Sequence, residues 1–205
     1  MPPDEGRGAV RPELARIGRS IVEHLNGGGT APYQLYVYRP EDEWKVRTEM
    51  QDLRRWLEAP DQRTTCVAVS LAEVLWEALD ERGRLDDLAA MEEEAAGDPL
   101  ALAEAHRAVA EVLREEPTVA DRVVRRVTAA GGGKPRVAVF LYRAGSLYPA
   151  MRTSAILEDL LGRVQRPVTL LYPGSVEGEF GLRFMGRCEP TYGYRATIVV
   201  RGTSA

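Results

Sequence analysis

Short runs of apolar residues alternate with longer amphipathic segments along most of the chain. Three of these runs, Tyr33–Tyr38, Thr64–Val69 and Arg136–Tyr142, are rich in aromatic and β-branched residues, which is typical of β-strands. The second and third are almost wholly apolar, as strands buried on both faces of a sheet are. Later strands are predicted at Val168–Tyr172, Phe180–Phe184 and Ala196–Arg201.

The segments between these strands carry apolar residues at helical spacing. A helix is predicted at Arg11–Leu25, after a frayed tail at residues 1–9, and another at Glu41–Leu57, where three leading acids suit the positive end of the helix dipole. Further helices are predicted from Ser70 to Asp80 with a Ser70–Glu73 capping box, from Arg84 to Ala95, from Asp98-Pro99 onward, from Thr118 to about Ala129 with a Thr118–Asp121 capping box, and from Pro149 at position N1 to about Leu161.

Strands that alternate with helices favour an α/β fold, with a mostly parallel central sheet and helices on both faces. The topology is expected to be Rossmann-like or P-loop-like, without a Walker A loop. The chain is predicted to form a single domain over residues 1–205. Residues 84–130 contain no predicted strand and are expected to be a helical insertion or subdomain.

The loop after the strand at Arg136–Tyr142 is the strongest candidate for a binding site. In parallel α/β sheets, ligands bind beyond the carboxyl ends of the strands, and this loop offers a glycine, hydroxyl groups, two arginines and a predicted helix N-terminus. Such groups can hold an anion; the alternative is that they only pack and pair locally. The candidate residues of this loop are Arg143, Gly145, Ser146, Tyr148, Arg152 and Ser154.

Three further places could contribute to the same edge of the sheet. A second polar loop is predicted at Tyr172 and Gly174, after the next strand. Glu43 and Arg47 follow the first strand, and Arg195 precedes the last one. A salt-bridged structural corner is the favoured interpretation of the latter two places.

No complete catalytic constellation is present in the sequence. Gly131–Gly133 with Lys134 resembles a phosphate-binding loop, but Pro135 replaces the required Ser or Thr, and a helix precedes the segment instead of a strand. GxGxxG and GxSxG motifs are absent, and His24 and His106 are distant in sequence from Ser146. The two cysteines, Cys66 and Cys188, fit no metal-binding spacing and are predicted to be buried thiols. We therefore expect no enzyme activity, no metal site and no cofactor.

Charge is spread unevenly along the chain, although the net charge is only −4. Residues 70–118 carry 14 acidic and 4 basic side chains, a net charge of −10, and residues 119–205 carry 13 basic and 6 acidic ones, a net charge of +7. The acidic region is either a partner surface or the solvated face of helices. Arg122, Arg125 and Arg126 form a small basic stripe, which is a weak indication of phosphate contact. No apolar run is long enough for a membrane span or a signal peptide, so a cytoplasmic location is expected.

Several segments together resemble one protein family. They are VYRPEDEWKVR at 37–47, VAVSLAEVLWEAL at 67–79, FLYRAGSLYPAMRTSAILEDLLGRV at 140–164, PVTLLYPG at 167–174 and YRA at 194–196. The series resembles the B component, BrxB, of BREX bacteriophage-exclusion systems, and the match covers nearly the whole chain. The helical region 84–130 carries little of it.

The resemblance implies the defence system to which the protein belongs, but no catalytic residues. Proteins of this family belong to defence systems with a large ATPase, an adenine-specific DNA methyltransferase and a phosphatase-like protein, PglZ. The implied role is a non-catalytic adaptor subunit that binds other BREX components, above all the PglZ-type protein, with an indirect association with DNA. Two alternatives stay open: a degenerate nucleotide- or phosphate-binding protein that uses Arg143 and Arg152, and direct DNA binding through the basic C-terminal part.

Overall fold

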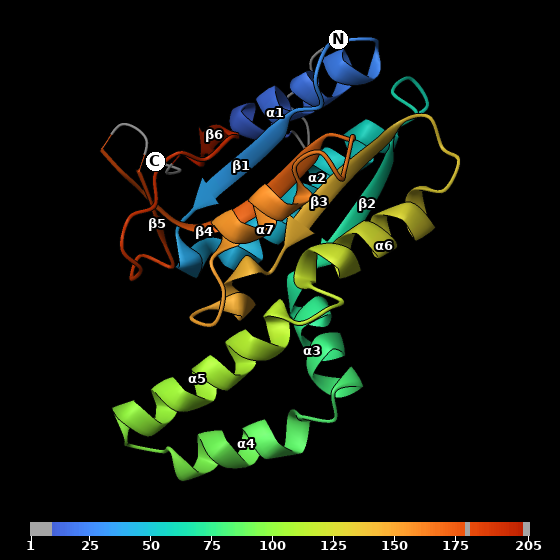
Figure 1. Cartoon of the computed structure of the whole chain (residues 1–205). Coiled ribbons are helices and arrows are strands. Elements are labelled where there is room, and N and C mark those ends of the chain that lie inside the picture. Colours follow the sequence, from blue (N-terminus) through green and yellow to red (C-terminus); the bar gives the residue numbers. More distant parts are fainter. Residues whose placement is uncertain (1–9, 179–180, 203–205) are drawn as a thin grey trace.

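The protein folds around a central parallel sheet, as a computed structural model shows (Figure 1). The structure describes residues 10–178 and 181–202. Neighbouring strands follow the order β2-β3-β4-β1-β6, all parallel, and β5 pairs antiparallel with the extended end of β4. The predicted α/β class with a mostly parallel sheet is confirmed. The strands are β1 (Tyr33–Tyr38), β2 (Thr65–Ser70), β3 (Val137–Tyr142), β4 (Val168–Glu177), β5 (Gly181–Phe184) and β6 (Thr197–Val200).

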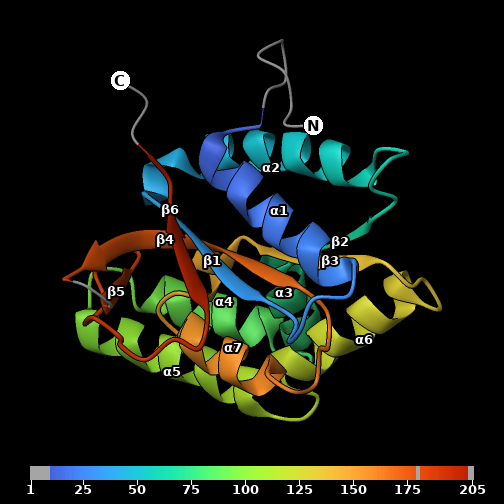
Figure 2. The ribbon, with the colours of Figure 1, turned by 90° about the horizontal axis from the view of Figure 1, so that it is seen from above.

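Helices cover both faces of the sheet, which divides the apolar interior into two cores. Figure 2 shows α1 (Pro12–Leu25) and α2 (Glu43–Glu58) on one face, and α3 (Leu71–Glu81), α6 (Val119–Gly131) and α7 (Thr153–Leu160) on the other. Side chains alternate along each strand, so Leu35 and Val37 of β1 pack with the α3 side while Tyr36 and Tyr38 pack with the α1 side. Because both faces of the sheet are buried, residues on both sides of each strand are apolar, and the strands appear in the sequence as continuous apolar runs.

The acidic middle of the chain forms a helical hairpin. α4 (Leu85–Glu94) and α5 (Pro99–Arg114) pack against each other and lie beyond the carboxyl ends of β2 and β3, below α3 in Figure 1. Asp98 caps α5 as predicted, because its carboxylate accepts from the Leu100 and Ala101 amides. We call α4 and α5 the insertion; it bounds one side of the region where the loop after β3 lies.

The loop after β3 differs from the prediction at its far end. Residues Ala144–Leu147 form a short 3-10 helix, η2, and the Met151 amide donates to the Leu147 carbonyl. This turn carries the chain past Pro149, so α7 begins at Thr153 and the prediction of Pro149 at helix position N1 is wrong. The helix N-terminus therefore lies farther from Arg143 than the sequence indicated.

Two other local predictions are corrected. β4 continues to Glu177, because its second half pairs with β5, so Tyr172 and Gly174 are strand residues and no polar loop follows Tyr172. Ser70 accepts from the Glu73 amide, but the Glu73 carboxylate pairs with Arg126 on α6 and does not complete a capping box. Phe180 and the tail at residues 1–9, for which predictions were made, lie outside the described residues.

Both cysteines are free thiols in different surroundings. Cys66 is buried on β2, and burial raises the pKa of its thiol to about 12. Cys188 is only half-buried, so the prediction of two buried thiols is wrong for this residue, which follows the β4–β5 ladder near the surface. Among the described residues, no helix is long and apolar enough to cross a membrane.

The capping box that opens α6 is confirmed and gives a pH-dependent contribution to stability. The Thr118 hydroxyl accepts from the Asp121 amide, the Asp121 carboxylate accepts from the Thr118 amide, and Arg163 pairs with the same carboxylate. The Arg163 contact, with those from Thr118, lowers the pKa of Asp121 to about 2.

Because the pKa of Asp121 is lower in the folded chain, its stabilising effect is complete above the unfolded pKa and is lost as the pH falls toward the folded one. We expect Asp121→Asn to be less stable than the native chain at about pH 5, with a difference that shrinks toward about pH 3. Urea unfolding at both pH values measures this. Glu158→Gln, at an exposed α7 carboxylate, is the matched control; a constant difference for Asp121→Asn would contradict the argument.

Candidate protein-binding groove at the carboxyl edge of the sheet

The loop after β3 is held by contacts within itself. Arg143 adopts a left-handed conformation with φ of 58°, which turns the chain into η2. The Ser146 hydroxyl donates to the Arg143 carbonyl over 2.8 Å. Ala144 and Leu147 are buried and belong to the core on the α3 side. The loop is thus anchored in the core, and its Ser146 hydroxyl already forms a hydrogen bond within the loop.

A groove separates this loop from the insertion. It encloses about 220 Å³ between α3, α4, α5 and the segment that follows η2. Most of its walls are apolar, and Trp76 stands at its side with 59% of its surface exposed. We call this hollow the insertion groove; its main apolar residues are Leu75, Trp76, Leu79, Leu85, Leu88, Val109 and Tyr148.

Three polar residues line the insertion groove beside these apolar ones: Glu92, His106 and Ser146. The structure therefore brings together Ser146 and a histidine that lies 40 positions away in the chain. No hydrogen bond joins these two described side chains, because the Ser146 hydroxyl donates to the Arg143 carbonyl. A serine nucleophile is activated by a base within hydrogen-bond reach, and in this arrangement the Ser146 hydroxyl is bonded to a backbone carbonyl instead.

The other candidate residues of the loop line different hollows. Arg152 faces a hollow of about 400 Å³ that it shares with Arg114 and Asp159. Ser154 borders a smaller hollow with Tyr194 and Arg195. Pro149 and Ala150 line both the insertion groove and the Arg152 hollow. The structure therefore distributes these loop residues over three hollows instead of gathering them at one anion site.

Tyr172 and Gly174 lie within β4, inside the sheet. Tyr172 is fully buried, which raises the pKa of its phenol, and it accepts a long hydrogen bond of 3.5 Å from the Tyr194 hydroxyl. Gly174 pairs with Phe184 of β5. These positions hold β5 and the chain around Tyr194 against the sheet.

Glu43 and Arg47 belong to α2, which covers the other face of the sheet. The Tyr38 hydroxyl donates to Glu43, and the Arg47 guanidinium lies 4.8 Å from the centre of the Trp44 ring and 6.0 Å from that of Tyr142. Arg47 and Tyr142 also border a hollow of about 130 Å³. The two residues form a packed corner beside Trp44 and do not share a hollow with the loop residues.

The basic stripe on α6 is neutralised by α3. Arg122 is buried and contacts Glu77 over 3.1 Å and Glu81 over 2.7 Å, while Arg126 pairs with Glu73 over 3.2 Å. Arg125 lies 3.8 Å from Glu77. The stripe therefore supplies the arginines of an ion-pair network between α6 and α3. The spacing of the arginines in the sequence did not reveal this role.

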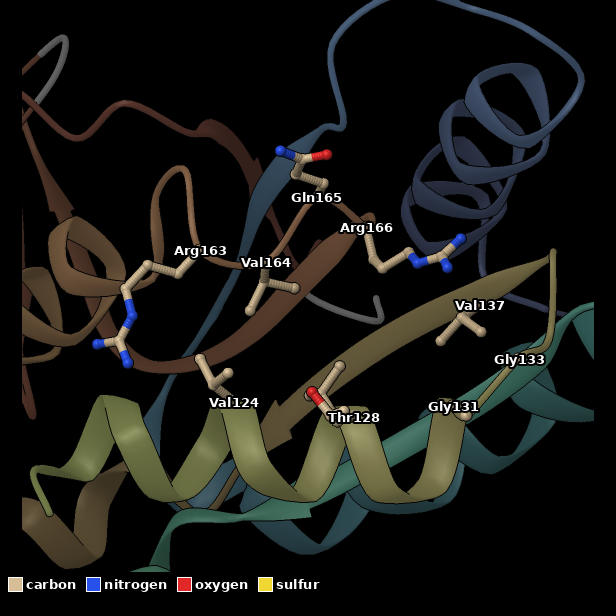
Figure 3. Close-up of a pocket in the computed structure, with 11 residues that line it drawn as sticks. Val124, Thr128, Gly131, Gly133, Val137, Arg163, Val164, Gln165 and Arg166 are labelled. Carbon is tan, nitrogen blue, oxygen red and sulfur yellow. The ribbon is translucent and has the colours of Figure 1, made fainter.

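The three glycines that resemble a phosphate-binding loop lie at the opposite, amino edge of the sheet. They border a hollow between the end of α6 and residues 163–166 (Figure 3). Figure 3 shows Val124 and Val164 pointing into this hollow, while the Arg163 and Arg166 side chains extend to opposite sides. Arg163 pairs with Asp121 and Arg166 donates to the Pro135 carbonyl. The order helix, glycines, strand is confirmed, and the segment connects α6 to β3.

Comparisons with known proteins agree on one family. The sequence model of the family described as "BREX protein BrxB" matches residues 67–199. A curated protein with the same description, from Bacillus cereus (strain H3081.97), is 26% identical over 178 residues, which cover 86% of this chain and 88% of the relative. No solved structure matches the chain. The family match includes every residue that lines the insertion groove.

Proposed function

Because the chain belongs to the BREX protein BrxB family, we propose that it is a non-catalytic adaptor subunit of a BREX system. In this proposal it binds a larger component, the PglZ-type protein, and the insertion groove is the contact surface. The family match supports membership of a BREX system, and the adaptor role and the choice of partner are our inference.

The observation that supports this role is the composition of the insertion groove. One wall is the loop segment around Tyr148, which belongs to the family-like stretch 140–164, and the other walls come from α3 and the insertion. Trp76 exposes 59% of its surface there. Exposed aromatic side chains beside an apolar hollow are characteristic of protein-binding surfaces, where tryptophan contributes much of the binding energy.

The arrangement of the loop supports a binding role over a catalytic one. Ser146 is bonded to the Arg143 carbonyl, and the two arginines considered for an anion site are separated by η2, with Arg152 in a hollow of its own beside Arg114. The basic stripe on α6 faces carboxylates of α3. These contacts favour the apolar insertion groove over the loop arginines as the binding surface at the carboxyl edge of the sheet.

Copurification tests the proposed function. We expect the tagged chain, isolated from cells that express all other components of its BREX system, to retain the PglZ-type protein. Trp76→Ala should reduce the retained amount by about tenfold or more, because interface tryptophans commonly contribute 2 kcal/mol or more. Trp44→Ala is the matched control, since Trp44 is even more exposed, at 74%, but lies on α2.

Three outcomes would count against the proposal. Retention of no BREX component by the native chain would remove the adaptor role. Retention of a different component would leave the adaptor role and replace the partner. Equal retention by the native chain and Trp76→Ala would move the contact surface away from the insertion groove.

A further inference from the structure

One helix of the insertion carries a large uncompensated negative charge. α4 contains Asp86, Asp87 and Glu92–Glu94, and no basic residue. Asp87 lies 3.6 Å from Arg84, but the other four acids form no ion pair with any residue that the structure describes. Of these acids, Glu92 lines the insertion groove, so the acidic end of α4 begins at the edge of the apolar hollow.

The position of three of these acids is unfavourable for the isolated fold. Glu92–Glu94 occupy the last turn of α4, where no basic residue is present. The helix dipole places partial negative charge at this end, so each glutamate there is disfavoured. The fold itself gains nothing from this arrangement, and a cation supplied from outside would relieve it.

The basic residues nearest in sequence are already engaged. Arg82 pairs with Glu115, Arg84 with Asp87 and Arg107 with Glu104. Arg114, at the end of α5, faces the separate hollow that contains Arg152. The acidic turn of α4 therefore lacks a partner among the described residues.

We propose that the insertion groove binds an amphipathic helix of a partner, whose apolar side chains fill the groove and whose lysines or arginines lie beside Glu92 and the acidic end of α4. The proposal rests on the adaptor function above and specifies the chemistry of its contact. Grooves between helices accept a further helix through apolar side chains at i, i+3, i+4 and i+7. The adjacent carboxylates select a basic sequence over an acidic one through charge complementarity.

A fluorescence titration tests this directly with the full chain. Trp44→Phe and Trp56→Phe leave Trp76, on the groove, as the only tryptophan of the three. The probes are two designed amphipathic peptides of equal length, one of leucine and lysine and one of leucine and glutamate. We expect the leucine–lysine peptide to shift Trp76 emission to shorter wavelength and the leucine–glutamate peptide to leave it unchanged.

Two charge variants with the same net charge separate the groove from general attraction of a cation. The first reverses Glu92, Glu93 and Glu94 to arginine, which suits the dipole of α4 and should not unfold it. The second reverses Glu23, Asp61 and Glu158, three exposed acids that form no ion pair with a described residue. We expect the first variant to weaken peptide binding by about tenfold or more and the second by less than about twofold.

The results distinguish this inference from the adaptor function. Equal weakening by both variants, or equal binding of both peptides, would overturn the inference even if copurification succeeds. Light scattering could show concentration-dependent dimers that disappear in the Glu92–Glu94 variant. A second copy of the chain would then fill the groove, and this result would also overturn the inference. Groove-dependent peptide binding together with failed copurification would support the inference and remove the proposed partner.

Discussion

Replacing Arg122 by alanine is expected to lower the free energy of unfolding by about 3 kcal/mol. Only 1% of this side chain is exposed, and its guanidinium contacts Glu77, Glu81 and the Pro117 carbonyl. These carboxylates hold the pKa of Arg122 above its ordinary value, with the Glu81 hydrogen bond as the largest cause. Removing the arginine leaves both acids of α3 without their buried partner. The loss lies at the lower end for a broken buried ion pair, because both carboxylates still contact water.

Arg125→Ala is the matched control for this prediction. Arg125 is also on α6, and its guanidinium lies 3.8 Å from the Glu77 carboxylate, but 57% of its side chain is exposed. Exposed pairs contribute about 0.2 to 1 kcal/mol, so a small loss is expected. Urea unfolding followed by circular dichroism measures both variants. Similar small losses would show that the α3–α6 network contributes little to stability. Because Trp76 is on α3, a real loss would also disturb the insertion groove.

Gly174→Ala is expected to lower the free energy of unfolding by about 2 to 3 kcal/mol, because overpacking at a close backbone approach displaces a paired strand. A Cβ atom at this position would lie 2.3 Å from the Arg183 carbonyl oxygen of β5 and 2.7 Å from the Tyr172 ring. Neither the paired backbone nor the buried ring can move away easily. The β4–β5 ladder should therefore open.

Gly131→Ala is the control for Gly174→Ala. A Cβ atom at Gly131 would meet only the Val137 methyl groups at 3.5 Å, an ordinary contact. This variant should be neutral or slightly more stable, since alanine restricts the unfolded chain. Thermal unfolding of the two variants compares them. If Gly174→Ala unfolds at the same temperature as the native chain, the hairpin tolerates a local shift and its glycine has no structural role.

The regular elements were predictable because their patterns are local. The β1 prediction at Tyr33–Tyr38 is confirmed at both ends, and the Thr118–Asp121 capping box opens α6 as expected. Pro149 was misleading because proline suits the first turn of a helix in general, whereas here η2 comes before it and α7 starts at Thr153. A local preference could not reveal that competing turn.

The candidate site depended on contacts that the sequence does not display. Ser146 and His106 lie on one groove only because the insertion folds back beside the loop. From the sequence, Arg122 was assigned to a basic stripe, because its partners, Glu77 and Glu81, precede it by more than 40 positions. The excess of acids in residues 70–118 was visible in the sequence, and the structure shows that four of the acids without an ion pair to a described residue lie on one helix, α4.

The strand order also has a consequence for how the chain folds during synthesis. β1 lies in the interior of the sheet, between β4 and β6, and Tyr33 aligns with Val168. β1 therefore has no neighbouring strand until β4 and β6, which follow it far along the chain, have been made. Parallel pairing between such distant segments is slow. We expect the apolar stretch YQLYVY to stay exposed until late in translation, when chaperone binding or aggregation would compete with its insertion into the sheet.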